Sequence, residues 1–412
     1  MGRTGRIDRV AGAPGARRHV GTATWRLRCK KRRLTGASSV ALLLLCGLLA
    51  SAAQATPSVR RSPSFLLDPA AQQGPLQAPV RSPTTAAESG PSDVETIRFF
   101  SSSFTYNGTT FPYQNVGTDP AHPRITIVRT VVVPIDLTFE NAIGVDPHLN
   151  GSDFTRRVLA SPVFVPTKFA ATEDFAQYAD AFQRAEYWNV GGKRSSFHTF
   201  LVPRAVAPVR LTVPAADGVA EQLGNGIPLG FLSFAWLEEH EQALLTSLRI
   251  SPHEFPIFIT HNALAEGALG NHEALTVTLP NGRTAIYTYA FATWLDAGAA
   301  VPFGFSESFA NDVMPLGHEV AEWMNDPFIT SAAPPWQWSV PPILPKACSN
   351  VIEVGDGLQQ FNTVAVPQFG FTYHLQDLTF FSWFARQTPS EGFAGRYTFL
   401  GTTFTSPSTP CS

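Results

Sequence analysis

Charged residues are scarce in this chain: Asp, Glu, Lys and Arg make up 15% of its 412 residues, whereas hydrophobic residues make up 44%. Globular proteins usually contain about a quarter charged residues, and disordered chains combine few apolar residues with a high net charge. The composition therefore excludes disorder of the whole chain and allows a large buried core. Proline (34 residues) and glycine (31 residues) are too frequent for a helical array or a coiled coil.

Basic residues are few after residue 55. Of the 30 Lys and Arg residues, 11 precede residue 56, and the 19 that follow are outnumbered by 31 acidic residues. Nucleic-acid binding needs basic residues gathered on one surface, because the phosphate backbone provides most of the affinity. We therefore expect no nucleic-acid partner.

No apolar run reaches the roughly 20 residues that a membrane-spanning helix needs. The apolar run over 40–53 follows the basic segment RLRCKKRR (26–33) and ends at Ala53-Gln54-Ala55. This order predicts a signal peptide over 1–55 with an extended basic n-region, and hence a secreted, extracellular or periplasmic protein without a transmembrane anchor in its mature form. Residues 56–94 are rich in Pro and Ser and are predicted to be a linker or propeptide, followed by a globular domain over 95–412.

Only two cysteines, Cys348 and Cys411, lie in the predicted globular domain. In an oxidising compartment, a disulfide between them would connect the C-terminal tail to the loop around Cys348.

Helical and strand patterns are mixed along the domain. Apolar spacing predicts helices over 172–188, 231–248 and 311–325. Strands are expected over 124–139 with a break at Pro134, over 197–213 as two extended segments, and over 255–260 and 284–293. The part after Pro327 is predicted to be rich in loops with short strands. Because no regular alternation of strand and helix is present, the predicted class is α+β.

The segment PLGHEVAEWMNDP (315–327) contains the pattern HExxE. His318 and Glu322 are four residues apart and therefore lie on one helical face, with Glu319 beside them. A helix presents two metal ligands and a neighbouring general base in this way. The same pattern also occurs on the polar face of an ordinary helix. However, this helix is otherwise apolar, and ionisable groups on a buried helix are costly unless they are paired or bind a metal.

Asp326 directly precedes Pro327, where the helix is expected to end. A carboxylate is unfavourable at the negative end of the helix dipole. We therefore predict that Asp326 either supports a metal ligand by hydrogen bonding or forms an Asx turn.

A third metal ligand must come from outside this helix. The segment NVIEVGDG (350–357) contains Glu353, the first choice because it follows an extended stretch, and Asp356, which glycines flank. Asp356 is expected to brace His318 through its second imidazole nitrogen, as outer carboxylates often do. His261 and His272 are the alternative ligands.

The blocks HEVAEWMNDP (318–327) and EVGD (353–356) resemble the signature of a group of secreted bacterial and fungal proteins of unknown function. They are more distantly similar to plant EXORDIUM-like phosphate-induced proteins. The segment Gly270-Asn271-His272 and residues 182–188 are also similar to the bacterial members. The resemblance implies a zincin-like domain with a mixed sheet and an HExxE active-site helix. The chain differs from the signature at Gly317, where Ser is common, and in the position of Cys348 before EVGD.

The first hypothesis for function is a secreted metal-dependent hydrolase, most naturally a peptidase acting on peptides or proteins. His318 and Glu322 would bind Zn²⁺, Glu319 would be the general base, and Glu353 or Asp356 would complete the site. Because this ligand set is rich in oxygen, Mn²⁺ or Ca²⁺ is also expected to bind.

The second hypothesis is a non-catalytic extracellular or cell-wall-associated binding protein of the EXORDIUM-like type. Trp336 and Trp338 in a Pro-rich segment would suit a surface that binds cell-wall polysaccharide, although tryptophans are more often buried in a core. A serine hydrolase is not supported, since the chain lacks a G-x-S-x-G motif.

Overall fold

The computed structural model describes residues 58–61, 65–66, 94–169, 175–340, 344–358, 363–401 and 403–411. These residues form a mixed α+β fold, which confirms the predicted class. The predicted signal peptide over 1–55 and most of the predicted linker over 56–94 lie outside the described residues. Within that linker, residues 58–61 and 65–66 form the short strands β1 (Ser58–Arg61) and β2 (Phe65–Leu66).

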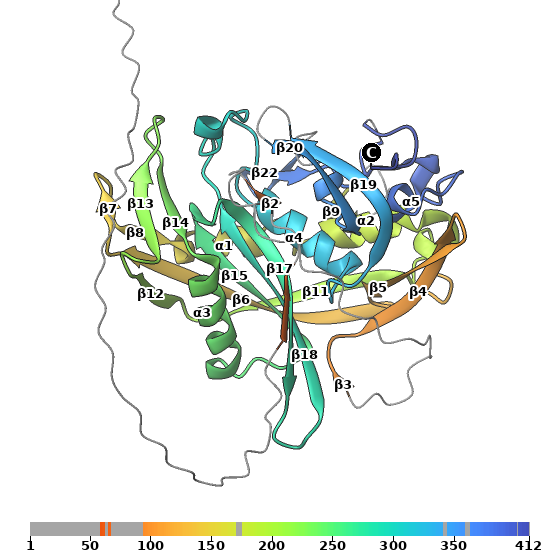
Figure 1. The fold of residues 1–412 in the computed structure, drawn as a ribbon, viewed down its shortest axis with the longest axis horizontal. Coiled ribbons are helices and arrows are strands. Elements are labelled where there is room, and N and C mark those ends of the chain that lie inside the picture. Colours follow the sequence, from red (N-terminus) through yellow and green to blue (C-terminus); the bar gives the residue numbers. More distant parts are fainter. Residues whose placement is uncertain are drawn as a thin grey trace, which may run out of the picture. The chain divides into compact units, whose positions relative to one another are not determined.

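A large mixed sheet is the centre of the fold (Figure 1), and fourteen of the described strands belong to it. In spatial order its main strands are β11 (His198–Ala205), β6 (Ile125–Phe139), β15 (Glu254–His261), β18 (Thr284–Trp294), β17 (Ala268–Thr278), β16 (Ala263–Ala265), β14 (Pro228–Leu232), β13 (Gly218–Gln222) and β7 (Ala142–Ile143). The strands that pair beside this path are β1, β2, β3 (Val94–Glu95), β8 (His148–Asn150) and β12 (Val209–Val213).

The direction of the strands changes at β17. Strands β11, β6, β15 and β18 run parallel to one another, whereas β17 is antiparallel to β18. Strands β1 and β2 pair with β17, both in the antiparallel direction. The part of the chain that precedes the globular domain therefore contacts the same strand that contains His272.

Strands β6 and β15 carry apolar residues on both sides, and other elements cover both faces of the sheet there. Along β6, Val128 and Val132 belong to one core, and Val131 and Val133 belong to the other. The first core includes helices α2 (Tyr178–Glu186) and α4 (Met314–Asn325), and the second includes α3 (Phe234–Ser247). Helix α4 lies against β17 and β18.

The predicted break at Pro134 is wrong, since β6 is continuous from Ile125 to Phe139. On one side of β6, β11 pairs as far as Val132 and β12 begins at Ile135. On the other side, Pro134 is the last residue paired with β15. Pro134 thus lies where the pairing partners change, so its missing N–H does not interrupt a ladder.

Helices α3 and α4 match the predictions over 231–248 and 311–325 closely. The helix predicted over 172–188 is shorter, and the residues just before it form β10. The remaining elements are the hairpins β4 (Phe99–Tyr106) with β5 (Thr109–Val116), β9 (Thr167–Lys168) with β10 (Phe175–Ala176), β19 (Ala332–Val340) with β20 (Leu344–Val351) and β21 (Thr363–Gln368) with β22 (Phe371–Gln376), and the short helices α1 (Thr155–Leu159) and α5 (Phe381–Phe384).

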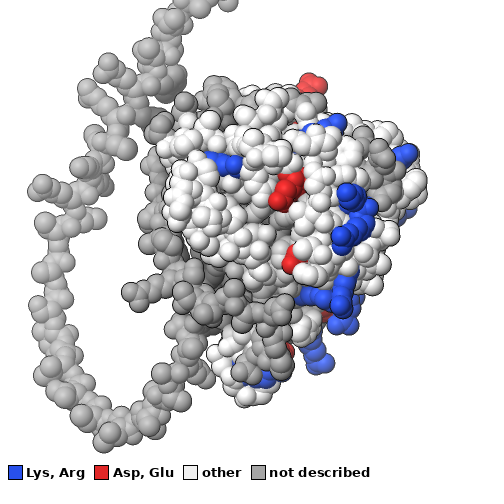
Figure 2. Space-filling model, turned by 90° about the vertical axis from the view of Figure 1, so that its right-hand side faces the viewer, with Lys and Arg blue, Asp and Glu red and all other residues white. Residues whose placement is uncertain are grey.

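The C-terminal part contains the hairpins β19–β20 and β21–β22, which loops join, and a disulfide links its end to β20. Cys348 of β20 is bonded to Cys411, as expected. Among the described residues, no helix combines the length and the apolar character needed to cross a membrane. The face drawn in Figure 2 is largely uncharged, with scattered basic and acidic side chains.

Candidate metal centre

Helix α4 is buried along its whole length, including its ionisable side chains. His318 and Glu322 lie one turn apart, and His318 Nε2 is 3.1 Å from Glu322 Oε1. The i, i+4 spacing therefore predicted their convergence correctly. Trp323 on the same helix stacks on Phe255 of β15 and donates a hydrogen bond to Thr288 Oγ1 of β18 at 2.9 Å. These contacts fix the rotation of α4 on the sheet.

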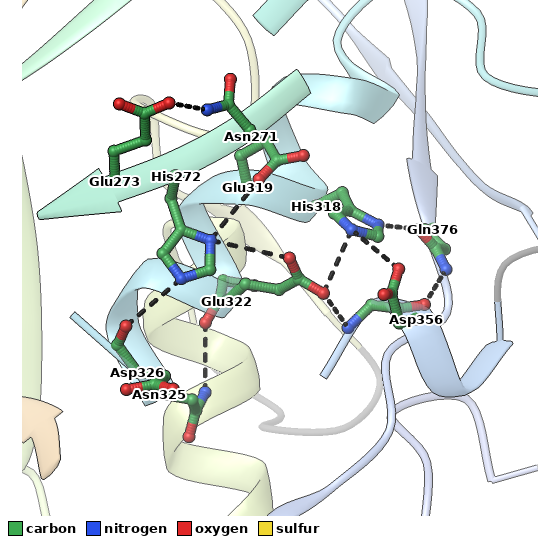
Figure 3. Close-up of polar contacts among 12 residues, drawn as sticks. Asn271, His272, Glu273, His318, Glu319, Glu322, Asn325, Asp326, Asp356 and Gln376 are labelled. Carbon is green, nitrogen blue, oxygen red and sulfur yellow. Dashed lines mark hydrogen bonds and ion pairs between the residues drawn. The ribbon is translucent and has the colours of Figure 1, made fainter. Parts of the chain in front are cut away.

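His272 reaches the same place from β17 (Figure 3). Its Nδ1 is 3.6 Å from Glu319 Oε2 and 3.7 Å from Glu322 Oε2. Its Nε2 is 3.2 Å from the backbone carbonyl of Asp326, to which it can donate a hydrogen bond. This contact leaves the Nδ1 lone pair directed at the two carboxylates. The sequence predicts His272 only as an alternative metal ligand, but the structure places it beside Glu319 and Glu322 of α4.

The EVGD segment folds back onto α4. Glu353 is fully buried, and it belongs with His272 and Glu322 to a group whose ligand atoms lie within 4.8 Å of one another. The N–H of Gly355 donates a hydrogen bond to Glu322 Oε1 at 3.1 Å, and Asp356 Oδ1 is 3.6 Å from His318 Nε2. A Cβ atom on Gly355 would overlap the His318 ring. Glycine is therefore needed for this close approach of the backbone.

Gln376, at the end of β22, is the residue that contacts the second nitrogen of His318. Its Oε1 is 2.7 Å from His318 Nδ1, and its Nε2 donates to the carbonyl of Gly355 at 2.5 Å. Tyr178 donates a hydrogen bond to the Gln376 backbone carbonyl. Because the amide oxygen can only accept, His318 must carry a proton on Nδ1 and present Nε2 to the carboxylates. The bracing expected from Asp356 therefore comes from Gln376, and Asp356 lies on the opposite side of the ring.

Asp326 makes hydrogen bonds with both its side chain and its backbone carbonyl. Its carboxylate accepts hydrogen bonds from the N–H groups of Thr330 and Ser331, at 2.8 and 3.0 Å. The carboxylate thus organises the turn after the helix, while the backbone carbonyl contacts His272. These N–H groups are four and five residues further on, whereas an Asx turn bonds two residues on, so the predicted Asx turn is not formed. The support of a ligand comes from the backbone of Asp326 and not from its side chain.

Burial and mutual repulsion strongly shift the protonation of the cluster. Burial lowers the pKa of His318, but the surrounding carboxylates, Glu322 first, outweigh burial and raise this pKa from 6.5 to about 10. For His272, burial prevails over the attraction of Glu322 and lowers the pKa to about 4. Burial also raises the pKa values of Glu319 and Glu353 well above their usual range. Without another cation, protons must therefore neutralise the carboxylates.

Several carboxylate oxygens in the cluster lack hydrogen bonds. Within the described ranges, neither oxygen of Glu319 or Glu353 accepts a hydrogen bond, and the same is true of Glu322 Oε2. All three side chains are fully buried. Leaving a buried polar atom unpaired costs about 1–3 kcal/mol, and more for a charged group. A bound cation would satisfy these oxygens, so the donor set fits a divalent metal ion.

The other alternative ligand, His261, lies elsewhere. Its Nε2 pairs with Asp296 Oδ2 at 3.0 Å, and its ring contacts that of Phe154. The described residues contain two groups of metal-ligand geometry, and His261 belongs to neither.

Comparisons of the chain with protein-family models, with curated proteins and with solved structures give no match. The similarity to EXORDIUM-like proteins and to zincins therefore stays a prediction from the sequence blocks.

Proposed function

We propose that this protein is a divalent-metal hydrolase and that its substrate is a peptide or protein. The position of Glu319 is the observation that carries the proposal. Its carboxylate lies 3.6 Å from His272 Nδ1 and belongs to one group with His318 and Glu322. Both of its oxygens lack hydrogen bonds from the described residues, and its pKa is raised by burial. These properties suit a group that accepts a proton during catalysis.

In this proposal some side chains of the centre bind the cation, and another transfers protons. His318 and Glu322, with Asp356 of the EVGD segment beside His318, would hold a cation, which would supply Lewis acidity toward a substrate carbonyl when bound. Glu319 is the general base that takes a proton from the attacking water and transfers it to the leaving amine.

The donor set limits the choice of cation. Imidazole nitrogen favours Zn²⁺, whereas carboxylate oxygen favours harder ions such as Mn²⁺ and Ca²⁺. Two carboxylate ligands neutralise the charge of a divalent ion and make it a weaker Lewis acid than an all-histidine site. We therefore expect modest hydrolytic rates.

A zincin-like domain and a secreted location form part of the proposal. The packing of the HExxE helix α4 against β17 and β18 supports the first. The disulfide between Cys348 and Cys411 supports the second, because disulfides persist mainly in oxidising compartments.

Complete burial of the cluster favours a second candidate, a non-catalytic extracellular protein that a closed metal site stabilises. His272, His318, Glu322 and Glu353 all have 0% exposure. Structural metal sites are closed, whereas catalytic sites keep an open position. Such a protein would bind its partner, a protein or a cell-wall polysaccharide, at another surface.

Glu319→Gln is the variant that tests the proposed hydrolase. We expect peptide hydrolysis to fall about 10²-fold or more, while the metal content measured by mass spectrometry is unchanged. Glu241→Gln, which changes a buried carboxylate of α3, is the matched control and should alter neither quantity.

Loss of metal from Glu319→Gln would show that Glu319 is a ligand and would contradict its assignment as the base. A wild-type protein that contains metal but cleaves no peptide in a combinatorial library would favour the second candidate.

A further inference from the structure

The ligand-type side chains of the centre form two groups that share one carboxylate. His318, Glu319 and Glu322 make the first group, and His272, Glu322 and Glu353 make the second. Within each group the ligand atoms lie within 4.8 Å of one another. Among the described residues, no such group contains both histidines. The two imidazoles therefore define two positions rather than one.

Glu322 lies between the two imidazoles (Figure 3). Its Oε1 is 3.1 Å from His318 Nε2, and its Oε2 is 3.7 Å from His272 Nδ1. Each oxygen of Glu322 therefore faces a different imidazole. A carboxylate with one oxygen on each side is the usual bridge between two metal ions in hydrolytic sites.

The EVGD segment adds one carboxylate to each side. Asp356 Oδ1 is 3.6 Å from His318 Nε2, whereas Glu353 belongs to the group of His272. The side of His272 then has one imidazole, the Glu353 carboxylate and one oxygen of Glu322. The side of His318 has one imidazole and the other oxygen of Glu322, and the Asp356 carboxylate lies near the imidazole but outside the group of mutually close ligand atoms. Glu353 and Asp356, which the sequence predicts as alternatives for one place, thus lie beside different imidazoles.

When all carboxylates of the cluster are ionised, their charge also exceeds what one divalent ion neutralises. Four carboxylates, those of Glu319, Glu322, Glu353 and Asp356, are buried around the two imidazoles. One divalent cation neutralises two of them, and two cations neutralise all four. Burying an uncompensated carboxylate costs several kcal/mol, so the second cation has a strong electrostatic basis.

We propose that the centre binds two divalent cations bridged by Glu322. His318 and Asp356 hold one ion, and His272 and Glu353 hold the other. This inference rests on the proposed metal hydrolase and adds a second ion to it. Three carboxylates with two imidazoles favour Mn²⁺ over softer ions. Two ions about 3.5–4 Å apart can stabilise the attacking and the leaving oxygen together.

The test is a titration of the metal-free, full-length protein with Mn²⁺. Bound Mn²⁺ is counted by mass spectrometry after gel filtration, and electron paramagnetic resonance distinguishes coupled from isolated ions. We expect two Mn²⁺ per chain with an exchange-coupled spectrum. One Mn²⁺ per chain with an isolated-ion spectrum overturns the second ion and leaves the proposed hydrolase intact. No bound Mn²⁺, with the same result for Zn²⁺ and Ca²⁺, overturns both.

Glu353→Gln tests the assignment of the second ion. A folded Glu353→Gln protein, checked by circular dichroism, should bind one Mn²⁺ and give the isolated-ion spectrum. Two bound ions, or none, would overturn the assignment. His261→Gln is the control, because His261 also pairs with a carboxylate but lies in neither group, and it should keep both ions.

Discussion

Different neighbours contact the two ring nitrogens of each imidazole in the centre. Nδ1 of His318 bonds to Gln376, and Nε2 of His272 bonds to the backbone carbonyl of Asp326. The other nitrogen of each ring, the inner one, faces carboxylates. Outer hydrogen bonds of this kind fix the tautomer and the ring orientation of a metal-binding histidine. The identity of residue 376 should therefore affect metal affinity without any direct contact with the ion.

Replacement of Gln376 by Leu should weaken metal binding by about 10- to 100-fold, because His318 loses the acceptor that holds its proton on Nδ1. Calorimetric titration with Mn²⁺ measures this change. Gln242→Leu on α3, where the side chain donates a hydrogen bond to Glu238 of its own helix, is the control and should keep the wild-type affinity. Equal affinities of the two variants would contradict the role of Gln376.

Asp377 should make the stability of the fold depend on pH. Burial raises the pKa of its carboxyl from 3.8 to about 6, despite the hydrogen bond that it accepts from the N–H of Leu400. The folded state therefore binds this proton more tightly than the unfolded state does. No penalty arises below pH 3.8, and it grows to about 3 kcal/mol as the pH rises through 6.

Asp377→Asn should remove this dependence, since the amide oxygen can still accept from Leu400 and carries no charge. Urea unfolding at pH 4 and pH 7 should show the variant gaining stability relative to wild type at the higher pH. An equal difference between the two proteins at both pH values would contradict the assignment to Asp377.

The sequence predicted only part of the centre at the level of residues. His318 and Glu322 were predictable because one helical turn brings them together. His272 lies on β17, and only the packing of α4 against the sheet places it beside them. Gln376 had no sequence signal, because its role depends on a backbone contact with Gly355 and on one imidazole nitrogen.

At the level of elements, β17 connects the centre to the part of the chain before the globular domain. Strand β1 pairs with Glu273–Thr276 of β17, and β2 pairs with Ala268 and Gly270. His272 lies between these two paired stretches. A strand edge that loses its partner exposes unpaired N–H and C=O groups and opens more easily.

Deletion of residues 1–66 should therefore make the metal more accessible. We expect chelator-induced metal loss to accelerate about tenfold, which corresponds to ~1.4 kcal/mol and to the loss of one or two net hydrogen bonds. Deletion of residues 1–57 keeps both strands and is the matched control. Equal rates of metal loss from the two truncated proteins would show that β1 and β2 do not protect the centre.

The elements themselves were largely predictable where their patterns are long. Helices α3 and α4 match their predicted ranges because apolar residues recur in them at helical spacing. Strands β15 and β18 match because runs rich in β-branched and aromatic residues cover them. Pro134 misled the prediction of β6, because a single sequence does not show that neighbouring strands end beside it. The pairing of β1 and β2 was likewise hidden, since β-pairing between distant segments depends on the fold.

At the level of the whole molecule, the central sheet separates two apolar cores, and the carboxylates of the centre are buried on the side of α4. A chain with so few charged residues nevertheless places four acids in one buried cluster. Burial of this kind is costly unless cations compensate it. We therefore expect divalent metal ions to be part of the folded protein.

Anomalous X-ray diffraction from crystals of the Mn²⁺-loaded protein, measured on both sides of the manganese absorption edge, tests this claim most directly. We expect anomalous density on both sides of the Glu322 carboxylate, one peak beside His318 and one beside His272. A difference map without anomalous density at Glu322, from crystals in which the carboxylates keep their present positions, would contradict it.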